Sequence, residues 1–128
     1  MVKRTPFASI VFLSLFAVAA PAGAHHSANA QFDTSKEFVL TGVLTQLEEV
    51  NPHSRWHVDV TAADGTVTSW NLEGVSPNGL RRAGVRIKDD LKIGGTYSFT
   101  VAPSKDGSHL AFLKAITVNG RLVQMVQL

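Results

Sequence analysis

The sequence predicts an all-β domain with one short helix, arranged as an OB-like barrel of five or six strands. Apolar and polar residues alternate through several short segments, as they do in half-buried strands. Tight-turn pairs follow the second, fourth and fifth of these segments, and they are Asp64-Gly65, Asp106-Gly107 and Asn119-Gly120. One helix-start signal lies between the third and fourth strands. This order favours the OB-like barrel, and a plain antiparallel sandwich is the alternative.

The first three strands are predicted from residue 37 to the helix. The first is long, from residue 37 to 50, and Gly42 interrupts its alternation, which indicates a bulge or a sharp bend. Asn51-Pro52 then turns the chain into the second strand, where Trp56 and Val58 alternate with polar residues. The third strand is expected from residue 66 to 73, after the Asp64-Gly65 turn.

The helix and the last three strands are predicted from residue 76 onward. Ser76 is a suitable N-cap, Pro77 suits the first turn, and Gly84 ends the helix. Residues 85 to 95 are expected to be irregular. The remaining strands are predicted at residues 96–101, 110–118 and 122–126.

The first 24 residues have the features of an export signal. Lys3 and Arg4 precede an apolar run of about 14 residues, which is short of the roughly 20 that span a bilayer as a helix. The small residues Ala22-Gly23-Ala24 then form a cleavage site. We therefore expect a periplasmic protein with a signal peptide at 1–24, a flexible arm at 25–36 and one barrel domain at 37–128. A second site at Ala28-Asn29-Ala30 is the alternative cleavage point.

The balance of charge argues against nucleic acid as a partner. The whole chain has 12 Lys and Arg against 10 Asp and Glu, and removal of Lys3 and Arg4 leaves ten of each. Nucleic-acid binding draws most of its affinity from an excess of Lys and Arg. We also expect no membrane association after cleavage. The chain has no cysteine, which excludes a lipid-modified N-terminus and any disulfide.

Histidines supply the one chemically suggestive constellation. Cleavage after Ala24 would place a free amine on His25, beside His26. An N-terminal histidine chelates Cu(II) through its amine and ring, and nitrogen donors suit copper and zinc. His53 or His57 could complete this metal site if the arm folds back. The two cannot both ligate one ion unless the chain bends at Pro52, because four residues of strand separate them by about 13 Å. The alternative is a leader whose histidines have only weak, adventitious metal affinity.

Catalytic signals are lacking. No serine, histidine and aspartate stand in a recognisable triad context, so we expect a protein that is not an enzyme. Glu73 is expected to cap the helix or to pair with Arg81 or Arg82. Trp56 and Trp70 are expected to belong to the core more than to a ligand platform.

A set of short motifs resembles a family of small exported bacterial proteins that carries a domain of unknown function. The resemblance extends over essentially all of the chain after residue 24. It implies a compact, β-rich periplasmic protein, and it brings no established activity or catalytic residues. Gly94-Gly95 departs from the Gly-Asp pair typical of the family, which affects a turn. The motifs are His25-His26-Ser27, Phe32-Asp33, Leu40-Thr41-Gly42, Asn51-Pro52-His53, Trp70-x-x-Glu73, Ser76-Pro77-Asn78 with Leu80 and Arg82, Gly84, Leu91-Lys92-x-Gly94 and Lys105-Asp106-Gly107-Ser108.

Three functions are compatible with these observations. The favoured one is a non-enzymatic binding or adaptor module for an envelope protein or a small ligand. The first alternative is a copper or zinc protein that uses His25 and His26 with His53 or His57. The second is an accessory subunit of an enzyme, with the segment from Trp70 to Arg82 as its contact surface. The sequence does not indicate the ligand or the oligomeric state.

Overall fold

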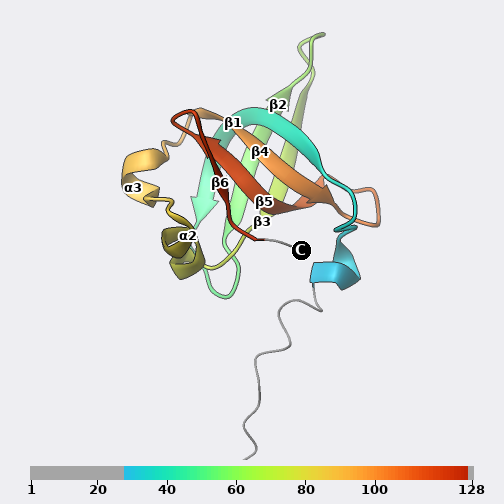
Figure 1. Ribbon diagram of the computed structural model, residues 1–128. Helices are drawn as coiled ribbons and strands as arrows, with labels where there is room; N and C mark the ends of the chain where they lie inside the picture. The colour runs from blue at the N-terminus through green and yellow to red at the C-terminus, as the bar shows by residue number, and fades with distance from the viewer. Residues whose placement is uncertain (1–27, 127–128) are drawn as a thin grey trace, which may run out of the picture.

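Six strands and two short helices follow one another in the computed structural model, which describes residues 28–126 (Figure 1). A further helical turn occupies residues 28–31. Within the described part, no helix is long and apolar enough to cross a membrane. The elements are β1 (Phe38–Glu48), β2 (Arg55–Thr61), β3 (Val67–Glu73), α2 (Pro77–Ala83), α3 (Ile87–Asp90), β4 (Thr96–Pro103), β5 (Leu110–Val118) and β6 (Arg121–Gln124).

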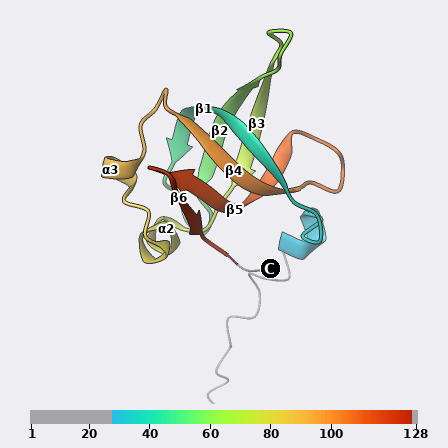
Figure 2. The same ribbon diagram turned by 45° about the horizontal axis from the view of Figure 1, so that its top comes forward.

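The strands form a closed five-stranded barrel with one extra strand, which confirms the predicted OB-like architecture. β1 pairs with both β2 and β4, and β4 pairs with β5. The barrel closes through a short parallel ladder between β3 and β5, from Asn71 opposite Leu110 to Glu73 opposite Phe112. β6 pairs with the second half of β5, beyond the point where β3 leaves it (Figure 2).

The long first strand changes partner near its middle, which lets it belong to both sides of the barrel. Its first half pairs with β4 and its second half with β2. A Cβ on Gly42 would lie 2.6 Å from the carbonyl oxygen of Asp59, so glycine permits the close approach of β2. The register shift lies further along, between Leu44 and Gln46. Gly42 therefore marks the close approach of β2 to β1, and the bulge lies further along β1, between Leu44 and Gln46.

The predicted helix is present, and the prediction that it is the only helix is wrong. In α2 the Ser76 hydroxyl accepts a hydrogen bond from the backbone of Gly79 at 3.1 Å, and Gly84 adopts a left-handed φ of 98°. The one-turn helix α3 lies in the stretch expected to be irregular. It is held by the Asp90 carboxylate, which accepts a hydrogen bond from the backbone N–H of Arg86 at 2.8 Å. A four-residue turn has no apolar period, so no sequence pattern announces it.

The interior of the barrel is filled by large apolar side chains from every strand. Trp56 and Phe99 are fully buried, and their ring centroids lie 6.2 Å apart. A smaller cluster joins the N-terminal segment to the barrel, where the Phe32 ring packs 5.5 Å from that of Phe112. Phe32 also forms a β-bridge with Ser104. The segment 28–32 is therefore fixed against the loop between β4 and β5.

Candidate binding site

The outer face of β1, β2 and β3 presents polar side chains in rows. Because alternate residues of a strand share a face, Arg55 and His57 point away from the core that holds Trp56. Arg55 is opposite Glu48 on β1 and Glu73 on β3. In the next row, His57 is flanked by Gln46 on β1 and by Asn71 on β3. The register of three strands thus brings an arginine, a histidine, two glutamates and two amides together.

These rows border a cleft of about 350 Å³. The cleft lies over β2 and β3, which is the face that OB-folds use for oligonucleotides and oligosaccharides. No Phe, Tyr or Trp is among the described residues that line it. Its lining residues are Gln31, Glu48, Arg55, His57, Asn71, Leu72, Glu73 and Leu110.

Two histidines at the cleft are each held by a carboxylate. His57 Nε2 lies 2.6 Å from the Oε1 of Glu48, and both side chains are about one-third exposed. His53 contacts Glu73 in the same way through its Nδ1. The second nitrogen of each ring has no hydrogen-bond partner within residues 28–126. Such rings are oriented by one nitrogen and available through the other, as metal-binding and proton-transferring histidines are.

Two expected pairings are wrong. Glu73 does not pair with Arg81 or Arg82, because the turn before β2 places His53 beside it. Arg81 instead donates a hydrogen bond to the side-chain oxygen of Asn78 and lies 4.0 Å from Glu49.

Buried Ser54 fixes the loop that carries His53. Its hydroxyl donates to the Val75 carbonyl at 2.7 Å and accepts from the Trp56 indole N–H at 2.9 Å. The backbone N–H of Gly74 donates to the Ser54 carbonyl at 2.9 Å. These bonds join the β1–β2 loop to the segment after β3, so His53 and Arg55 project from a rigid base.

The loop between β4 and β5 holds Gln31 and leads into Leu110, two residues that line the cleft. The Asp106 carboxylate accepts hydrogen bonds from the Ser104 hydroxyl at 2.8 Å and the Ser108 backbone N–H at 2.9 Å. Hydrogen bonds from Ser108, together with that from Ser104, lower the pKa of Asp106 from 3.8 to about 2. The backbone N–H of Lys105 donates to the carbonyl of Gln31 at 3.0 Å, which fixes Gln31 at the edge of the cleft.

The structure describes two of the four proposed metal ligands. His25 and His26 lie outside the described residues. His57 lines the cleft, and His53 contacts Glu73, which also lines it. Within residues 28–126, no three His, Cys, Asp or Glu side chains gather closely enough to hold a metal ion. A metal at the cleft would therefore need donors from outside this part of the chain.

The aromatic side chains considered as a ligand platform belong to the packing. Trp56 is buried in the core. Trp70 is partly buried, with its ring centroid 5.7 Å from that of Phe38 and 4.9 Å from that of His109. His109 thus lies on Trp70 and does not line the cleft.

Sequence reasoning missed Arg55 and Asn71 as members of a site, although a signal was present. Residues equally distant from the middle of a hairpin face each other, and a hairpin centred on Asp64 places Arg55 opposite Glu73. No pattern in the sequence indicated that Gln31 and Glu48 belong to the site. Their places depend on the fold of the N-terminal segment and on the bulge in β1.

The comparisons with known proteins identify a family. A family model described as a family of unknown function, DUF6152, matches residues 13–124. The chain belongs to this family. The DUF6152 match extends to the last residue of β6, so it includes the whole barrel and the cleft. It confirms the resemblance noted from the motifs. A search of curated proteins finds no significant match.

Proposed function

We propose that this DUF6152 protein is exported to the periplasm and acts there as a non-enzymatic binding module. Its ligand, a segment of an envelope protein or a small polar molecule, occupies the cleft over β2 and β3. The observation that carries the proposal is the convergence of hydrogen-bonding side chains from three strands and Gln31 on one hollow. Small-ligand sites have volumes from about 300 Å³ upward, so the cleft lies at the lower end of that range.

The chemistry of the lining suits a polar ligand with both donors and acceptors. Arg55 supplies a fork of N–H donors, and Asn71 and Gln31 supply an amide donor and acceptor each. Each of the two glutamates contacts a histidine ring through one carboxylate oxygen, which leaves the other oxygen as an acceptor for a ligand. No serine or other hydroxyl nucleophile is among the described lining residues, which supports binding over covalent chemistry.

Export is supported by the first 24 residues. Their charged start, apolar run and small-residue cleavage site follow the order of a signal peptide. The mass of the purified protein tests this directly, because cleavage after Ala24 leaves a chain that starts at His25.

The binding proposal is tested by affinity capture from a periplasmic extract with three forms of the tagged mature chain. The cleft variant is Arg55→Ala with Asn71→Ala. The matched control is Thr41→Ala with Ser98→Ala, two exposed or half-exposed residues that hydrogen-bond at 3.0 Å on the β1–β4 face. We expect a protein or small molecule that the wild type and the control retain and the cleft variant loses. Equal retention by all three forms would contradict the proposal.

The alternative function is copper binding at the same cleft, and one observation favours it. Gln31 lines the cleft together with His57, so the chain that leads back to His25 and His26 leaves from this border. Glu48 holds the Nε2 of His57 and leaves Nδ1 as a donor, an outer-shell contact typical of metal ligands. His25, His26 and one of His57 or His53 would supply the nitrogens, and copper would bind more tightly than zinc.

Native mass spectrometry of protein purified from a copper-supplemented culture tests the alternative. Copper binding predicts a chain that starts at His25, carries one copper ion and loses it when an alanine precedes His25. His57→Ala is expected to lose copper if His57 is the third ligand, with His109→Ala as the matched control. A chain that starts at Gln31, or at His25 without copper, would contradict it. Ligand capture that survives replacement of His25, His26 and His53 by alanine would support the binding module and would argue against the copper function.

A further inference from the structure

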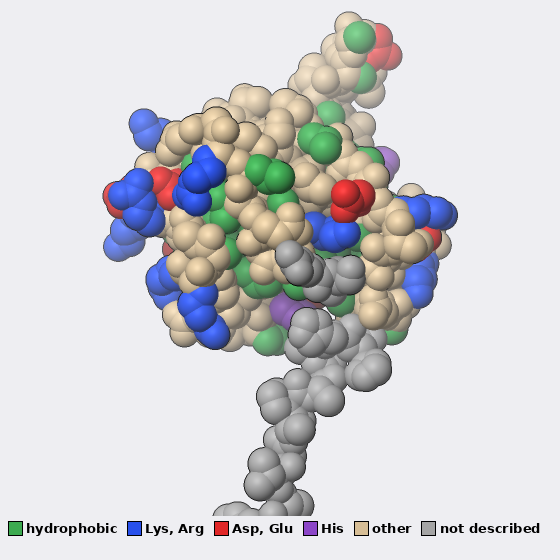
Figure 3. All heavy atoms as spheres, in the orientation of Figure 1, with side chains coloured by type: hydrophobic (Ala, Val, Ile, Leu, Met, Phe, Trp, Pro, Cys, Tyr) green, Lys and Arg blue, Asp and Glu red, His purple; other side chains and the backbone are tan. Residues whose placement is uncertain are grey.

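The fold separates charges that balance in the sequence. Six of the basic residues gather around α2, α3 and the start of β6, with three acidic ones, so this region has a net charge of +3. The other charged residues within 28–126 are four basic and seven acidic. In Figure 3, Lys and Arg side chains crowd the side of the molecule where Figure 1 shows α2 and α3. We call this region the basic end, with the basic residues Arg81, Arg82, Arg86, Lys88, Lys92 and Arg121 and the acidic residues Glu49, Asp89 and Asp90.

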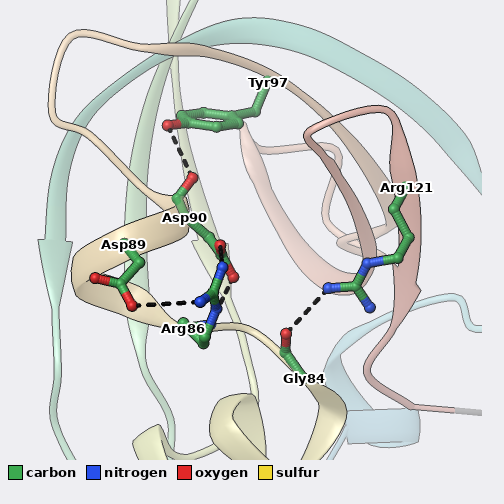
Figure 4. A network of polar contacts seen from close by, with 6 residues as sticks. All are labelled: Gly84, Arg86, Asp89, Asp90, Tyr97 and Arg121. Atoms are coloured by element: carbon green, nitrogen blue, oxygen red, sulfur yellow. Dashed lines mark hydrogen bonds and ion pairs between the residues drawn. The ribbon is translucent and has the colours of Figure 1, made fainter.

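Some of these cations have structural partners (Figure 4). Arg86 lies 3.0 Å from the carboxylate of Asp90 and 3.6 Å from that of Asp89. The Arg86 backbone N–H, and then its side chain, lower the pKa of Asp90 below its usual value, so this pair holds α3 in place. Arg121 donates to the carbonyl of Gly84 at 3.2 Å, a contact that leaves its charge without a carboxylate.

Three cations are open to solvent and engage nothing within residues 28–126. Arg82, Lys88 and Lys92 are exposed and make no side-chain hydrogen bond or ion pair there. They come from α2, α3 and the turn after α3, so they are spread over the end of the molecule. A dispersed set of this kind suits a broad negative surface better than one carboxylate group.

An apolar side chain projects beside these cations. Ile93 is 62% exposed in the turn that follows Lys92. It borders an apolar slot of about 180 Å³ that shares Glu49 and Ile87 with a larger hollow of about 490 Å³ lined by Arg81, Arg86 and Lys88. Apolar and cationic groups thus lie on one continuous surface, as they do in proteins that bind at a membrane interface.

We propose that the basic end docks reversibly on the surface of an anionic lipid bilayer, with Ile93 in the interfacial layer. Each Lys or Arg near such a surface raises the partition by about fivefold. The loop between β4 and β5, which has one lysine and one aspartate, lies on the opposite side of the barrel (Figure 2). The seven acidic residues outside the basic end are distributed over several elements. Charges are screened over about 8 Å at physiological ionic strength, so acidic groups farther than this from the bilayer oppose docking only weakly.

This contact revises the expectation of no membrane association after cleavage. That expectation concerned the apolar run, which leaves with the signal peptide, and the fold gathers six basic residues that a sum of charges over the sequence does not reveal. The docking is independent of the cleft over β2 and β3, so each proposal can fail without the other.

Co-sedimentation of the mature chain with lipid vesicles tests the docking. The probes are vesicles of equal parts phosphatidylglycerol and phosphatidylcholine, compared with pure phosphatidylcholine. We expect binding to the anionic vesicles that weakens with added salt, and binding at least about tenfold weaker to the neutral ones. Lys88→Gln with Lys92→Gln should lower the anionic partition by about 25-fold. Lys36→Gln with Lys105→Gln removes the same charge elsewhere and should change it by less than about twofold.

Ile93→Ser tests the apolar part, with an expected loss of about fivefold. Unchanged melting temperatures show that these exposed substitutions leave the fold intact. Equal binding to neutral vesicles, no sedimentation with anionic vesicles at low salt, or an equal effect of the control pair would overturn the docking. An unchanged partition of Ile93→Ser would overturn the placement of Ile93 in the interface.

Discussion

Ser54→Ala should destabilise the barrel more than the loss of one hydroxyl suggests. The Ser54 side chain is the acceptor for the buried Trp56 indole N–H, and it donates to the Val75 carbonyl. Alanine leaves the indole N–H without a partner in the core. The Val75 carbonyl still accepts a hydrogen bond from the backbone N–H of residue 54, at 3.2 Å, so the indole N–H is the one buried group that loses its partner.

The magnitude follows from these contacts. An orphaned buried donor costs about 1–3 kcal/mol, and the lost bond to Val75 adds about 1 kcal/mol. We therefore expect a loss of about 2–4 kcal/mol in the free energy of unfolding, or about 10 °C or more in melting temperature. Urea unfolding followed by tryptophan fluorescence measures it. The matched control is Ser69→Ala, which removes an exposed hydroxyl bonded to Asp59 and should cost less than about 0.5 kcal/mol.

A double-mutant cycle isolates the buried hydrogen bond. Trp56→Phe removes the indole N–H, so Ser54→Ala in that background no longer orphans a donor. The two changes together should cost about 1–3 kcal/mol less than the sum of the separate costs, because the orphaned donor is absent from the double variant. A cost below about 0.5 kcal/mol for Ser54→Ala, or additive costs in the cycle, would refute the reasoning.

Three further predictions concern the frame around the cleft. Gly42→Ala should lower the free energy of unfolding by about 1–3 kcal/mol in urea titrations, because its Cβ would press on the Asp59 carbonyl; a neutral result would contradict this contact. The Asp106 carboxyl should titrate by NMR near a pKa of about 2, held down by Ser108. Its stabilising effect is therefore complete above pH 3.8 and lost as the pH falls through 2, and a midpoint near 3.8 would exclude these bonds. Phe32→Ala should cost about 3 kcal/mol and speed proteolysis of the N-terminal segment, whereas an unchanged cleavage rate would show that the segment is held by other contacts.

Much of the barrel was predictable from local pattern. The fifth strand was predicted at residues 110–118, as observed, because its apolar run lies between two clear turns. The Asp64-Gly65 turn and the alternation around Trp56 likewise defined the second and third strands. The helix α3 was not predictable, since its stability depends on the side chain of Asp90 reaching back to the Arg86 backbone.

The candidate site was only partly predictable because it depends on contacts between distant segments. His53 and His57 were identified as chemically suggestive, but their glutamate partners come from β1 and β3. The position of Gln31 depends on the burial of Phe32 against the barrel. The separation of charge was hidden for the same reason, because a sum over the sequence carries no information about position.

In-cell photo-crosslinking tests the central claim that the cleft is a binding site. A photoreactive residue replaces Asn71 at the cleft in one strain, or Thr41 on the β1–β4 face in another. Both positions are exposed, so either can capture a neighbour. The account predicts one discrete adduct, found by mass spectrometry of the purified protein, from position 71 and not from position 41. No adduct at position 71, or the same adduct from both positions, would contradict it.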